Sequence, residues 1–535
     1  MVNYIMKIIR HLKMIKSCGE AEPPKMEESG SGLSDVLDEN IKLLTGTLAK
    51  SSDVIIRRFV LGKRINAAII YIDGLVDKNL VSETIMKPLM YYSDVNSLPE
   101  IVDMEYVKSS ILFTGSIEAV STMEDVIGKI LSGDTVLFID GEARALAVSL
   151  RNWKARGIEE PQTESVVRGP REGFTETLRF NTAMLRRKIK NPDLKFETIA
   201  IGERTKTDVC IAYIESIAKP ELIEEIKQRL SKIKIDAVLE SGYIEQYIED
   251  APYSIFSTVG NSERPDNVAG KMLEGRVAIL VDGTPFVLTA PCLFIESFQS
   301  CEDYYSRPYF ASILRILRFI AFLISLLAPA LYVALSTFHQ ELIPTPLLLS
   351  MAASHESVPF PAVVEAFIML LFFEILREAG VRLPRPIGQA VSIVGALVIG
   401  EAAVSAGLIG APMVIVVAVT AVSSFTVPAQ MDSGTIIRFA LLILAGFMGG
   451  VGVAVGLFAI LIHMATLKSF GIPYLMPVAP LDKNGLKDTF IRAPLWKLTK
   501  RPKGMAVDDI RQKPLPKPPQ AVKDNSEDKI NEDTI

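Results

Sequence analysis

The chain contains apolar runs that a water-soluble domain of ordinary size does not need. Phe319 to Phe338 reads FIAFLISLLAPALYVALSTF and carries no charge. With a rise of about 1.5 Å per residue, a helix of this length is about 30 Å long, which matches the hydrocarbon core of a bilayer. Further apolar segments follow at Pro361–Leu376, Ile387–Ile409, Pro412–Ala429 and Ile436–Leu467. This succession predicts an α-helical multi-pass membrane domain.

The last apolar segment, Ile436–Leu467, leaves the number of spans open between five and six. It is too long for one untilted helix and short for two, since a crossing helix needs about 20 residues. A single crossing would leave the C-terminal tail outside the cell, whereas its Lys and Arg residues favour the inside. Glycines here allow either a break or close helix contacts through G-x-x-x-G pairs: Gly446, Gly450, Gly452 and Gly456. We predict five spans, with six as the alternative.

The distribution of positive charge predicts the orientation of the chain. Arg315 and Arg318 precede the first span, and further arginines lie between residues 377 and 385, after the second. The intervening stretch His339–Phe360 has no Lys or Arg. Because cytoplasmic loops carry an excess of Lys and Arg, the pattern predicts a multi-pass protein of the cell membrane with a cytoplasmic N-terminal region.

Before the membrane domain, residues 33–310 contain a pattern that occurs twice. Gly128–Gly141 reads GKILSGDTVLFIDG and Gly270–Gly283 reads GKMLEGRVAILVDG, and the two align without a gap at an offset of 142 residues. Each copy combines a strand-like run with an Asp-Gly turn signal. We therefore predict a duplicated α/β soluble region in which Thr135–Ile139 and Val277–Val281 are equivalent strands.

Composition sets the expected domain boundaries. They are 1–32 for a basic N-terminal extension and linker, 33–150 for the first cytoplasmic α/β subdomain, 151–173 for a linker, 174–310 for the second subdomain, 311–470 for the transmembrane domain and 471–535 for a basic, Pro-rich tail. Apolar and basic residues in Met1–Lys16 recur at helical spacing, which is typical of a helix on an anionic membrane surface. A frayed tail is the alternative.

The sequence contains no recognisable catalytic or metal-binding motif. The four histidines are scattered, and neither G-x-S-x-G nor H-E-x-x-H occurs. The Gly-Lys pairs of the repeat lack the glycine-rich approach of a phosphate loop, so Lys129 and Lys271 are expected to face solvent. The four cysteines have no metal spacing and are expected to be reduced, unreactive thiols: Cys18, Cys210, Cys292 and Cys301. We predict no enzyme, no cofactor, no metal and no nucleic-acid partner.

Three acidic residues lie inside the apolar segments. Glu365 and Glu374 are near the ends of the second span, where headgroups or Arg377 lie within reach, so a structural role is expected first. Glu401 lies deep in the third segment, with no basic residue within two helical turns. A carboxylate there should face a water-filled path, or be protonated and bonded across a helix interface. Ser405 lies one turn further along the same face. The ion-pathway candidates are therefore Glu401 and Ser405, with Glu365 and Glu374 as further candidates.

Small residues form a separate stripe on the helix that carries Glu401. Its members are Gly388, Ser392, Gly395, Ala403 and Ala406. Such a stripe suits close packing against neighbouring helices. This arrangement predicts several copies of Ile387–Ile409 around an ion path, with Glu401 turned inward as acidic rings are in cation channels.

A set of long stretches carries a family resemblance. They are GPREGFTETLRFNTAMLRRKIK (Gly169–Lys190), SERPDNVAGKMLEGRVAILVDGTPFVL (Ser262–Leu288), DYYSRPYF (Asp303–Phe310), STFHQELIPT (Ser336–Thr345), VPFPA (Val358–Ala362) and FEILREAGVRLPRPIGQAVSIVGALVIG (Phe373–Gly400). From about Leu33 to about Pro502 the chain resembles the A subunit of bacterial spore germination nutrient receptors, the GerA type. The N-terminal extension and the Pro-rich tail lie outside the resemblance.

The resemblance implies a protein of the spore inner membrane that works with a transporter-like B subunit and a lipoprotein C subunit. In such receptors the B subunit binds the nutrient, and the A subunit forms a homo-oligomeric channel that releases monovalent cations. Two departures from the family pattern stand out. Val398–Gly407 reads VIGEAAVSAG where the family has V-I-G-Q-A-A-V-E-A-G, so the acid has moved from the position of Ser405 to Glu401. Tyr253–Val259 lacks the Phe-Pro-Gln that follows the Ser in the family.

Two other classes of function remain open on the residues alone. A stand-alone secondary transporter would show paired repeats in the membrane domain, whereas the repeat here is in the soluble region. A membrane-anchored scaffold would not require Glu401.

Overall fold

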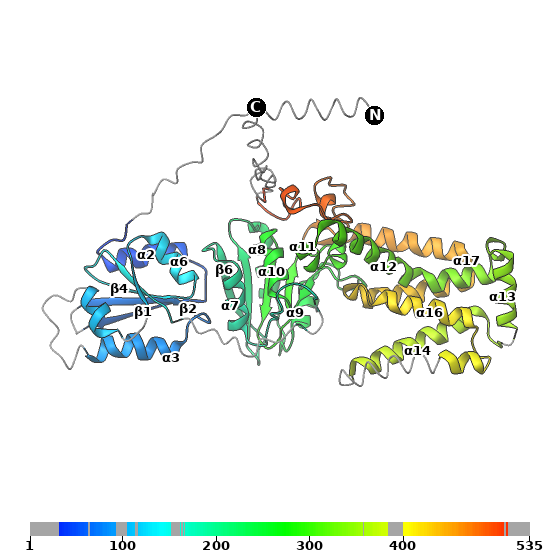
Figure 1. Cartoon of the computed structure of the whole chain (residues 1–535), viewed down its shortest axis with the longest axis horizontal. Helices are drawn as coiled ribbons and strands as arrows, with labels where there is room; N and C mark the ends of the chain where they lie inside the picture. The colour runs from blue at the N-terminus through cyan, green and yellow to red at the C-terminus, as the bar shows by residue number, and fades with distance from the viewer. Residues whose placement is uncertain are drawn as a thin grey trace, which may run out of the picture.

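The structure is a computed structural model, and it describes residues 32–61, 65–92, 104–112, 116–150, 161, 164, 166–356, 358–382, 400–507 and 510–511. In this part of the chain an α/β region precedes a bundle of long helices. The C-terminal segment returns from the bundle to the α/β region (Figure 1). We call the end of the bundle beside the α/β region its near end, and the opposite end its far end.

The first half of the α/β region is one antiparallel sheet with helices on both faces. Its strands are β1 (Val54–Leu61), β2 (Ile65–Ile72), β3 (Ile117–Val120), β4 (Thr135–Ile139) and β5 (Ala145–Val148). Its helices are α2 (Leu37–Thr47), α3 (Lys78–Leu80) with its continuations η2 (Val81–Met86) and η3 (Pro88–Tyr92), α5 (Met104–Tyr106) with η4 (Val107–Ile111), and α6 (Met123–Leu131). Helices α2 and α6 lie on one face of this sheet and α3 on the other (Figure 1).

The second half repeats this plan. Its strands are β6 (Leu194–Ile201), β7 (Thr207–Ile214), β8 (Gly260–Ser262), β9 (Val277–Val281) and β10 (Val287–Ala290). Its helices are α7 (Leu178–Lys188), α8 (Pro220–Ser231), α9 (Ser241–Ile248) and α10 (Pro265–Leu273), followed by η5 (Phe294–Phe298) and α11 (Glu302–Tyr305).

The two sheets have the same strand order. It is β1-β2-β4-β5-β3 in the first and β6-β7-β9-β10-β8 in the second, so β4 and β9 are equivalent, as the sequence repeat predicts. The register agrees as well, because Ile69 pairs with Leu137 in the first sheet and Ile211 with Ile279 in the second. In sequence number, each residue of the second pair follows its counterpart in the first pair by 142 positions, the offset of the sequence repeat. The prediction of a duplicated α/β region with equivalent strands is confirmed.

The Asp-Gly pairs of the repeat serve the same structural purpose in both halves. Gly141 and Gly283 adopt φ of +90° and +93°, a backbone conformation that glycine tolerates at no steric cost. The preceding Asp140 accepts a hydrogen bond from the N–H of Leu37 at 3.0 Å, and Asp282 accepts one from the N–H of Leu178 at 2.9 Å. Each aspartate thus satisfies an unpaired donor at the start of a helix.

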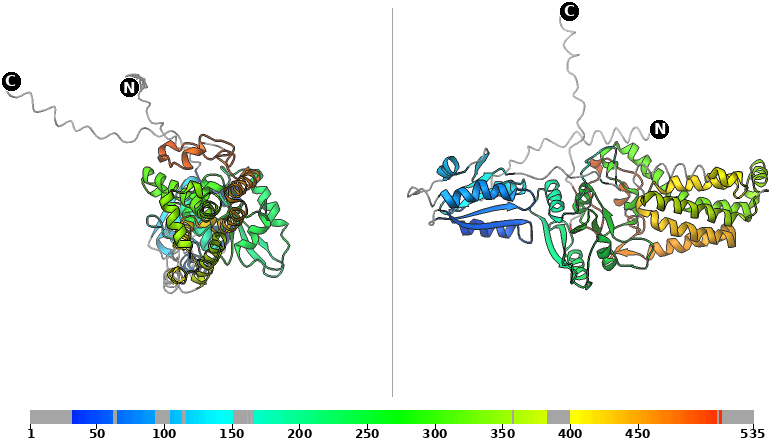
Figure 2. Two further views of the ribbon diagram at one scale, coloured as in Figure 1. Left: turned by 90° about the vertical axis from the view of Figure 1, so that its right-hand side faces the viewer. Right: turned by 90° about the horizontal axis from the view of Figure 1, so that it is seen from below.

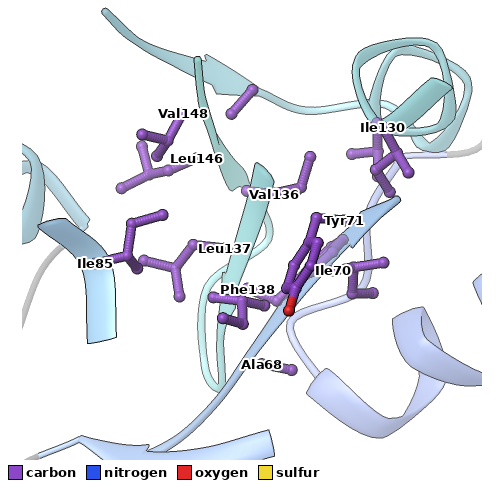
Figure 3. Packing of buried hydrophobic residues seen from close by; sticks show 14 of the residues in the cluster. Ala68, Ile70, Tyr71, Ile85, Ile130, Val136, Leu137, Phe138, Leu146 and Val148 are labelled. Atoms are coloured by element: carbon purple, nitrogen blue, oxygen red, sulfur yellow. The ribbon is translucent and has the colours of Figure 1, made fainter. Parts of the chain in front are cut away.

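Alternating strand residues fill the two faces of each sheet. In the first sheet Leu137 lies toward Ile85 of η2, and Val136 lies toward Ile130 of α6 (Figure 3). In the second sheet the odd-numbered residues of β7 pack with α8 and α9, and its even-numbered residues pack with α7 and α10. Because both faces are buried, the central strands read as continuous apolar runs rather than as alternating ones.

A buried ion pair joins the two halves of the α/β region. Arg186 of α7 and Asp53, just before β1, lie 3.0 Å apart with side chains that are 0% and 1% exposed. Arg186 also donates to the carbonyl of Leu194 at 2.7 Å. Ser51 forms a parallel bridge with Phe196 of β6, so the edges of the two sheets meet at this point.

The helical bundle begins directly after α11. Its helices are α12 (Pro308–Thr337), α13 (Thr345–His355), α14 (Ala362–Arg382), a helical stretch over residues 400–405, α16 (Ala411–Ser424) and α17 (Met431–Thr466), with short turns η6 (Gln340–Leu342) and η7 (Pro428–Gln430). Two of the described helices are long and apolar enough to cross a membrane, α12 and the stretch 428–466. Helix α14 carries more charge, and α16 is shorter. Helix α13 lies across the far end of the bundle (Figure 1).

Helix α17 reverses direction at Gly449 and is in fact two antiparallel arms, 431–448 and 450–466. Gly449 has φ 58° and ψ −139°, which lies outside the helical region. A Cβ placed on Gly456 would lie 2.6 Å from Leu441 Cδ2, although residues fifteen apart in one straight helix are about 22 Å apart. At the far end, His339 Nε2 accepts a hydrogen bond from the N–H of Gly450 at 3.2 Å.

Both ends of α17 therefore lie at the near end of the bundle. Gln430 donates to Ser297 Oγ at 2.8 Å before the first arm, and Ser254 Oγ lies 3.0 Å from His463 Nε2 at the end of the second. The prediction of five spans required a single crossing between Ile436 and Leu467. The reversal instead divides this segment into two antiparallel arms. Its length alone could not decide between one crossing and two.

The C-terminal segment, residues 468–507 and 510–511, packs back against the α/β region and the start of α12. It contains β11 (Lys468–Ser469), β12 (Ile472–Pro473), η8 (Gly485–Asp488) and η9 (Leu495–Lys497). Ser469 accepts from the N–H of Cys292 at 3.0 Å, and Val507 donates to the carbonyl of Ile217 at 2.9 Å. Figure 2 shows this segment between the α/β region and the bundle rather than beyond either of them.

Candidate functional site

The candidate ion-pathway acid, Glu401, is an exposed side chain on the surface of the bundle. The described helical stretch runs from Gly400 to Ser405, and Ser405 is exposed as well. No hydrogen bond or ion pair joins Glu401 to another described residue. Glu401 lies only about 6 Å along the helix axis from Ser405, the last helical residue, since each residue rises 1.5 Å. Its position is therefore one turn from the end of its helix rather than deep within the segment.

The stripe of small residues is seen only in part. Gly388, Ser392 and Gly395 lie outside the described residues. Ala403 is buried and packs in the core of the bundle, whereas Ala406 is exposed and does not pack there. Ala403 and Glu401 thus lie on different sides of the helix, with the alanine inward and the acid outward.

The four glycines proposed for helix packing lie at close approaches within the bundle. A Cβ on Gly446 would meet Val363 of α14 at 2.7 Å, and one on Gly450 would meet His339 at 3.1 Å. Gly452 and Gly456 face the other arm of α17, where the Leu444 carbonyl and the Leu441 side chain leave no room for a Cβ. These glycines allow backbones to approach within one chain.

Glu365 belongs to a polar cluster at the far end of the bundle. Its side chain is 0% exposed, and Oε1 lies 3.1 Å from His355 Nδ1 of α13. The other nitrogen, His355 Nε2, lies 2.9 Å from the hydroxyl of Tyr332 in α12. Glu365 Oε2 accepts from the N–H of Gly410 at 3.4 Å, just before α16. A single carboxylate therefore ties three helices together and compensates the positive end of α16.

Glu374 belongs to a second cluster, toward the near end. It pairs with Arg377 at 2.7 Å on its own helix, as the sequence predicts, and with Arg438 of α17 at 3.4 Å. Arg438 is 1% exposed, and its Nε donates to the carbonyl of Ser325 in α12 at 2.8 Å. Thr435 completes the cluster at 3.3 Å from Arg377. The cluster joins α12, α14 and α17 through charge-assisted hydrogen bonds.

Sequence reasoning missed two members of these clusters. Arg438 lies inside the apolar segment Ile436–Leu467, where a charge is costly and demands a partner, so its position alone could have identified it. His355 was one of four scattered histidines, and its pairing with Glu365 depends on the path of α13 across the far end. Spacing along the chain cannot reveal that contact.

A third cluster connects the α/β region, α12 and the C-terminal segment. Asp303 of α11 is 2% exposed and accepts from Arg315 at 2.8 Å and from Arg318 at 2.9 Å. Arg315 also reaches Asp488 of η8 at 2.8 Å. Tyr304 donates to Asp488 Oδ2 at 2.8 Å. The arginines that indicated the orientation of the first span thus also anchor the C-terminal segment.

Lys271 corrects an expectation from the repeat. It does not face solvent but lies 3.2 Å from Glu296, which also pairs with Arg276 at 2.8 Å. Burial alone would lower the pKa of Lys271, but the Glu296 carboxylate outweighs it and the pKa is raised. Burial likewise favours the neutral acid, yet Arg276 and Lys271 hold the pKa of Glu296 below its usual value. The second Gly-Lys pair is part of an ion-pair network and not a phosphate site.

The described cysteines have the environment of unreactive thiols. Burial raises the pKa of Cys210, Cys292 and Cys301 to about 12 in each case, far above the range in which a thiolate forms. All three are free thiols. Among the described residues there is also no group of His, Cys, Asp or Glu that could hold a metal ion. The polar clusters can bind, orient and stabilise charge.

Comparison with known proteins assigns the family. The sequence model of the Bacillus/Clostridium GerA spore germination protein family matches residues 42–504. The chain is 48% identical to "Spore germination protein KA" of Bacillus subtilis (strain 168), over 90% of this chain and 89% of that one. It is 46% identical to "Uncharacterized membrane protein YfkQ" of the same organism, over 88% of this chain and 91% of that one.

A solved structure is also similar. It is the N-terminal domain of the A subunit of the Bacillus megaterium spore germinant receptor GerK3, with 40% identity, 50% of this chain and 99% of that chain covered, and a TM-score of 0.41. The family match covers most of the chain, from the first helix of the α/β region to the C-terminal segment. The chain belongs to the Bacillus/Clostridium GerA family of spore germination proteins.

Proposed function

We propose that this chain is the A subunit of a spore germination nutrient receptor, and that several copies form a cation channel in the inner membrane of the spore. Membership of the GerA family supports the receptor role. The channel role rests on one observation, the exposed carboxylate of Glu401 in an otherwise apolar segment. As in receptors of this type, a transporter-like B subunit would bind the nutrient, and a lipoprotein C subunit would complete the assembly.

The course of the chain supports six crossings with both ends in the cytoplasm. Helix α12 leads from the near end to the far end, and α14 returns, because Glu365 is at the far end and Glu374 at the near end. The described residues 400–405 lead to Gly410 at the far end, which requires a crossing between Arg382 and Gly410, and α16 returns from there. The two arms of α17 add a final pair. The arginines at the near end favour the cytoplasmic side for that end, because cytoplasmic loops carry an excess of Lys and Arg.

An exposed carboxylate on this surface needs another molecule beside it. A charged side chain within a membrane helix costs about 2.5–3.5 kcal/mol even on the least demanding scale, so such residues face protein or water. The described residues of a single chain do not cover Glu401. A second copy, or a water-filled path between copies, would remove it from lipid. Ala403, packed inward, leaves the face of Glu401 free for that arrangement.

A ring of Glu401 side chains near the far mouth would concentrate cations and repel anions. Because the helix ends about one turn beyond Glu401, the ring would lie close to the outer opening rather than at mid-membrane. Ser405 would lie nearer the opening still, where it could replace part of the hydration shell of an ion. Glu365 and Glu374 contact polar partners inside each chain, so they would support the bundle and not line the path.

The test is the variant Glu401→Gln in spores that depend on this receptor. Release of potassium after a nutrient mixture that triggers unaltered spores should fall at least several-fold, while the amount of protein in the membrane is unchanged. Glu341→Gln is the matched control, because it removes one exposed carboxylate in the short turn η6, outside the long helices, and it should release cations normally. The pair Glu401→Gln with Ser405→Glu should restore much of the release.

The results separate the alternative functions. Normal release from Glu401→Gln would refute the pore role and favour a membrane-anchored scaffold. Loss of the Glu401→Gln protein from the membrane would show that Glu401 makes a structural contact between helices and does not line a path. Nutrient-driven transport by the chain alone, without the B and C subunits, would favour a secondary transporter. The oligomeric state of the purified chain in detergent tests the assembly directly, since a monomer at all concentrations would contradict it.

A further inference from the structure

The C-terminal segment exposes a surface that combines apolar and basic side chains. Its apolar members are Leu481 (66% exposed), Ile491 (63%), Leu495 (48%) and Trp496 (50%). Its basic members are the exposed lysines Lys483, Lys487, Lys497, Lys500 and Lys503. We call these residues the collar surface. Isolated exposed apolar residues are common on proteins, but a group of this kind within a stretch of 23 residues needs an explanation.

The collar surface lies beside the point where α12 becomes fully apolar. The ring of Phe490 packs on Phe319, the first residue of the charge-free run, with centroids 5.2 Å apart. The N–H of Arg492 donates to Ser312 Oγ at 3.0 Å, two turns before Phe319. The segment between Asp488 and Arg492 is therefore held at the level where the helix would enter the hydrocarbon core.

Among the described residues, no carboxylate forms an ion pair with any of these five lysines. The described acidic residues of the segment itself are Asp482 and Asp488, and both are already engaged. Asp488 pairs with Arg315, while Asp482 accepts from the backbone N–H groups of Asn484 and Gly485 at 3.1 and 3.2 Å. The five lysines thus leave a positive surface, whereas the more buried Arg492 and Arg501 point their guanidinium groups at backbone carbonyls.

We propose that the collar surface lies on the cytoplasmic leaflet and binds anionic phospholipid headgroups, with Trp496 and its apolar neighbours in the interface. Tryptophan is enriched at this depth because its ring is apolar and its N–H is polar. Each lysine near an anionic leaflet strengthens association by roughly fivefold, the equivalent of about 1 kcal/mol. The proposal rests on the membrane placement of the proposed function, but not on the channel.

An anionic lipid surface accounts for the collar surface better than a second protein does. The position is set by continuity with α12, so the surface and the bilayer meet without any further assembly. A protein partner would leave the lysines in need of acidic residues from elsewhere, whereas the leaflet supplies phosphate groups at that level. Headgroup binding would also hold the C-terminal segment against Arg315, and through it the start of α12.

The chain provides its own probe, because it contains only two tryptophans, Trp153 and Trp496. In the full chain with Trp153→Phe, the emission of Trp496 is measured in nanodiscs of phosphatidylcholine alone and of phosphatidylcholine mixed with phosphatidylglycerol. In the mixed discs we expect a shift of the emission to shorter wavelength, quenching by lipids brominated near the headgroup end of the acyl chain, and at least twofold protection from acrylamide.

Charge dependence is tested with two matched triple variants. Lys483→Gln, Lys487→Gln and Lys497→Gln together should abolish the difference between the two lipid compositions. Lys42→Gln, Lys78→Gln and Lys87→Gln form the control, since these exposed lysines belong to the first half of the α/β region, on the side away from the bundle (Figure 1). That control should retain the difference. Elution as a single species of unchanged size shows that the variants are folded.

The outcomes either support or overturn the proposal. If acrylamide quenches Trp496 in both lipid compositions and brominated lipid quenches it in neither, the proposal is overturned, because the surface would then face water. Equal quenching by brominated lipid in both compositions would overturn the part played by anionic headgroups. Protection of Trp496 only after addition of the B subunit would assign the surface to a protein. None of these results bears on Glu401, so failure here is distinct from failure of the channel proposal.

Discussion

Loss of the negative charge of Glu374 should destabilise the bundle far more than loss of a neighbouring acid. In Glu374→Gln the Arg438 guanidinium, 1% exposed, would lose its carboxylate partner and keep only uncharged acceptors, the new amide oxygen and the Ser325 carbonyl at 2.8 Å. Removing one partner of a buried ion pair typically costs about 3–5 kcal/mol. The 3.4 Å separation between Arg438 and Glu374, and the partial exposure of Glu374, favour the lower end of this range.

The same helix provides the control. Glu378 pairs with Arg382 one turn away, but both side chains are mostly exposed, so Glu378→Gln should change stability by less than about 0.5 kcal/mol. At roughly 2–4 °C for each kcal/mol, Glu374→Gln should lower the apparent Tm by about 6–12 °C. The assay is thermal loss of the helical circular dichroism of the full chain in detergent, at one scan rate because such unfolding is often irreversible.

A double variant separates charge burial from packing. Glu374→Gln combined with Arg438→Met removes both charges and leaves a side chain of similar length, so most of the lost stability should return. Equal Tm values for Glu374→Gln and Glu378→Gln would refute the reasoning, since Arg438 would then be solvated or paired elsewhere. Failure of the double variant to recover would show that the arginine is held by more than Glu374.

Three further outcomes follow from the fold. Asp53→Ala leaves Arg186 buried without its carboxylate and should lower the Tm of the full chain by several degrees. The double variant Asp53→Ala with Arg186→Met should recover most of this loss. Equal Tm values for the single and the double variant would contradict the ion-pair argument. Gly449→Ala forces a Cβ onto a positive φ and against Phe338, so the helical bundle should lose about 2 kcal/mol or more, measured by the same thermal assay, with Gly471→Ala, in open space, as the milder control. A cysteine at Glu341 should react with an impermeant thiol reagent in intact cells lacking the native cysteines, and one at Lys483 should not; the reverse pattern would invert the topology.

The α/β region could be predicted from the sequence because its signals are local and doubled. The ungapped repeat identified β4 and β9 as equivalent. The turns were recognisable from the Asp-Gly pairs, because glycine readily adopts the positive φ that a tight turn needs. The helix α9 and the short edge strands β3 and β8 were not predicted, because their sequences carry little periodicity. The ion pair of Lys271 was not predicted, because its partner Glu296 lies outside the repeated segment, in a short turn after β10.

The bundle was harder to predict, since apolar length does not determine the path of a chain. The reversal at Gly449 depends on one residue with a positive φ among several glycines that all permit it. The cluster of Tyr332, His355 and Glu365 depends on α13 crossing the far end, and no spacing rule predicts such a crossing. The exposure of Glu401 opposite the buried Ala403 agrees with the prediction that the acid and the small residues lie on different sides of the helix, although Ala406 is exposed too and Glu401 lies nearer the end of its helix.

The turn at Gly449 also limits how the bundle can move. The two arms of α17 are joined without a connecting loop, and Gly452 and Gly456 seat one backbone against the other. Sliding one arm past the other by a helical turn, about 5.4 Å, would require spare chain that this junction lacks. The hairpin is also tied to α12 at both ends, through Arg438 and through His339. Any opening of the bundle must therefore take place by displacement of the remaining helices against this rigid unit, and not within it.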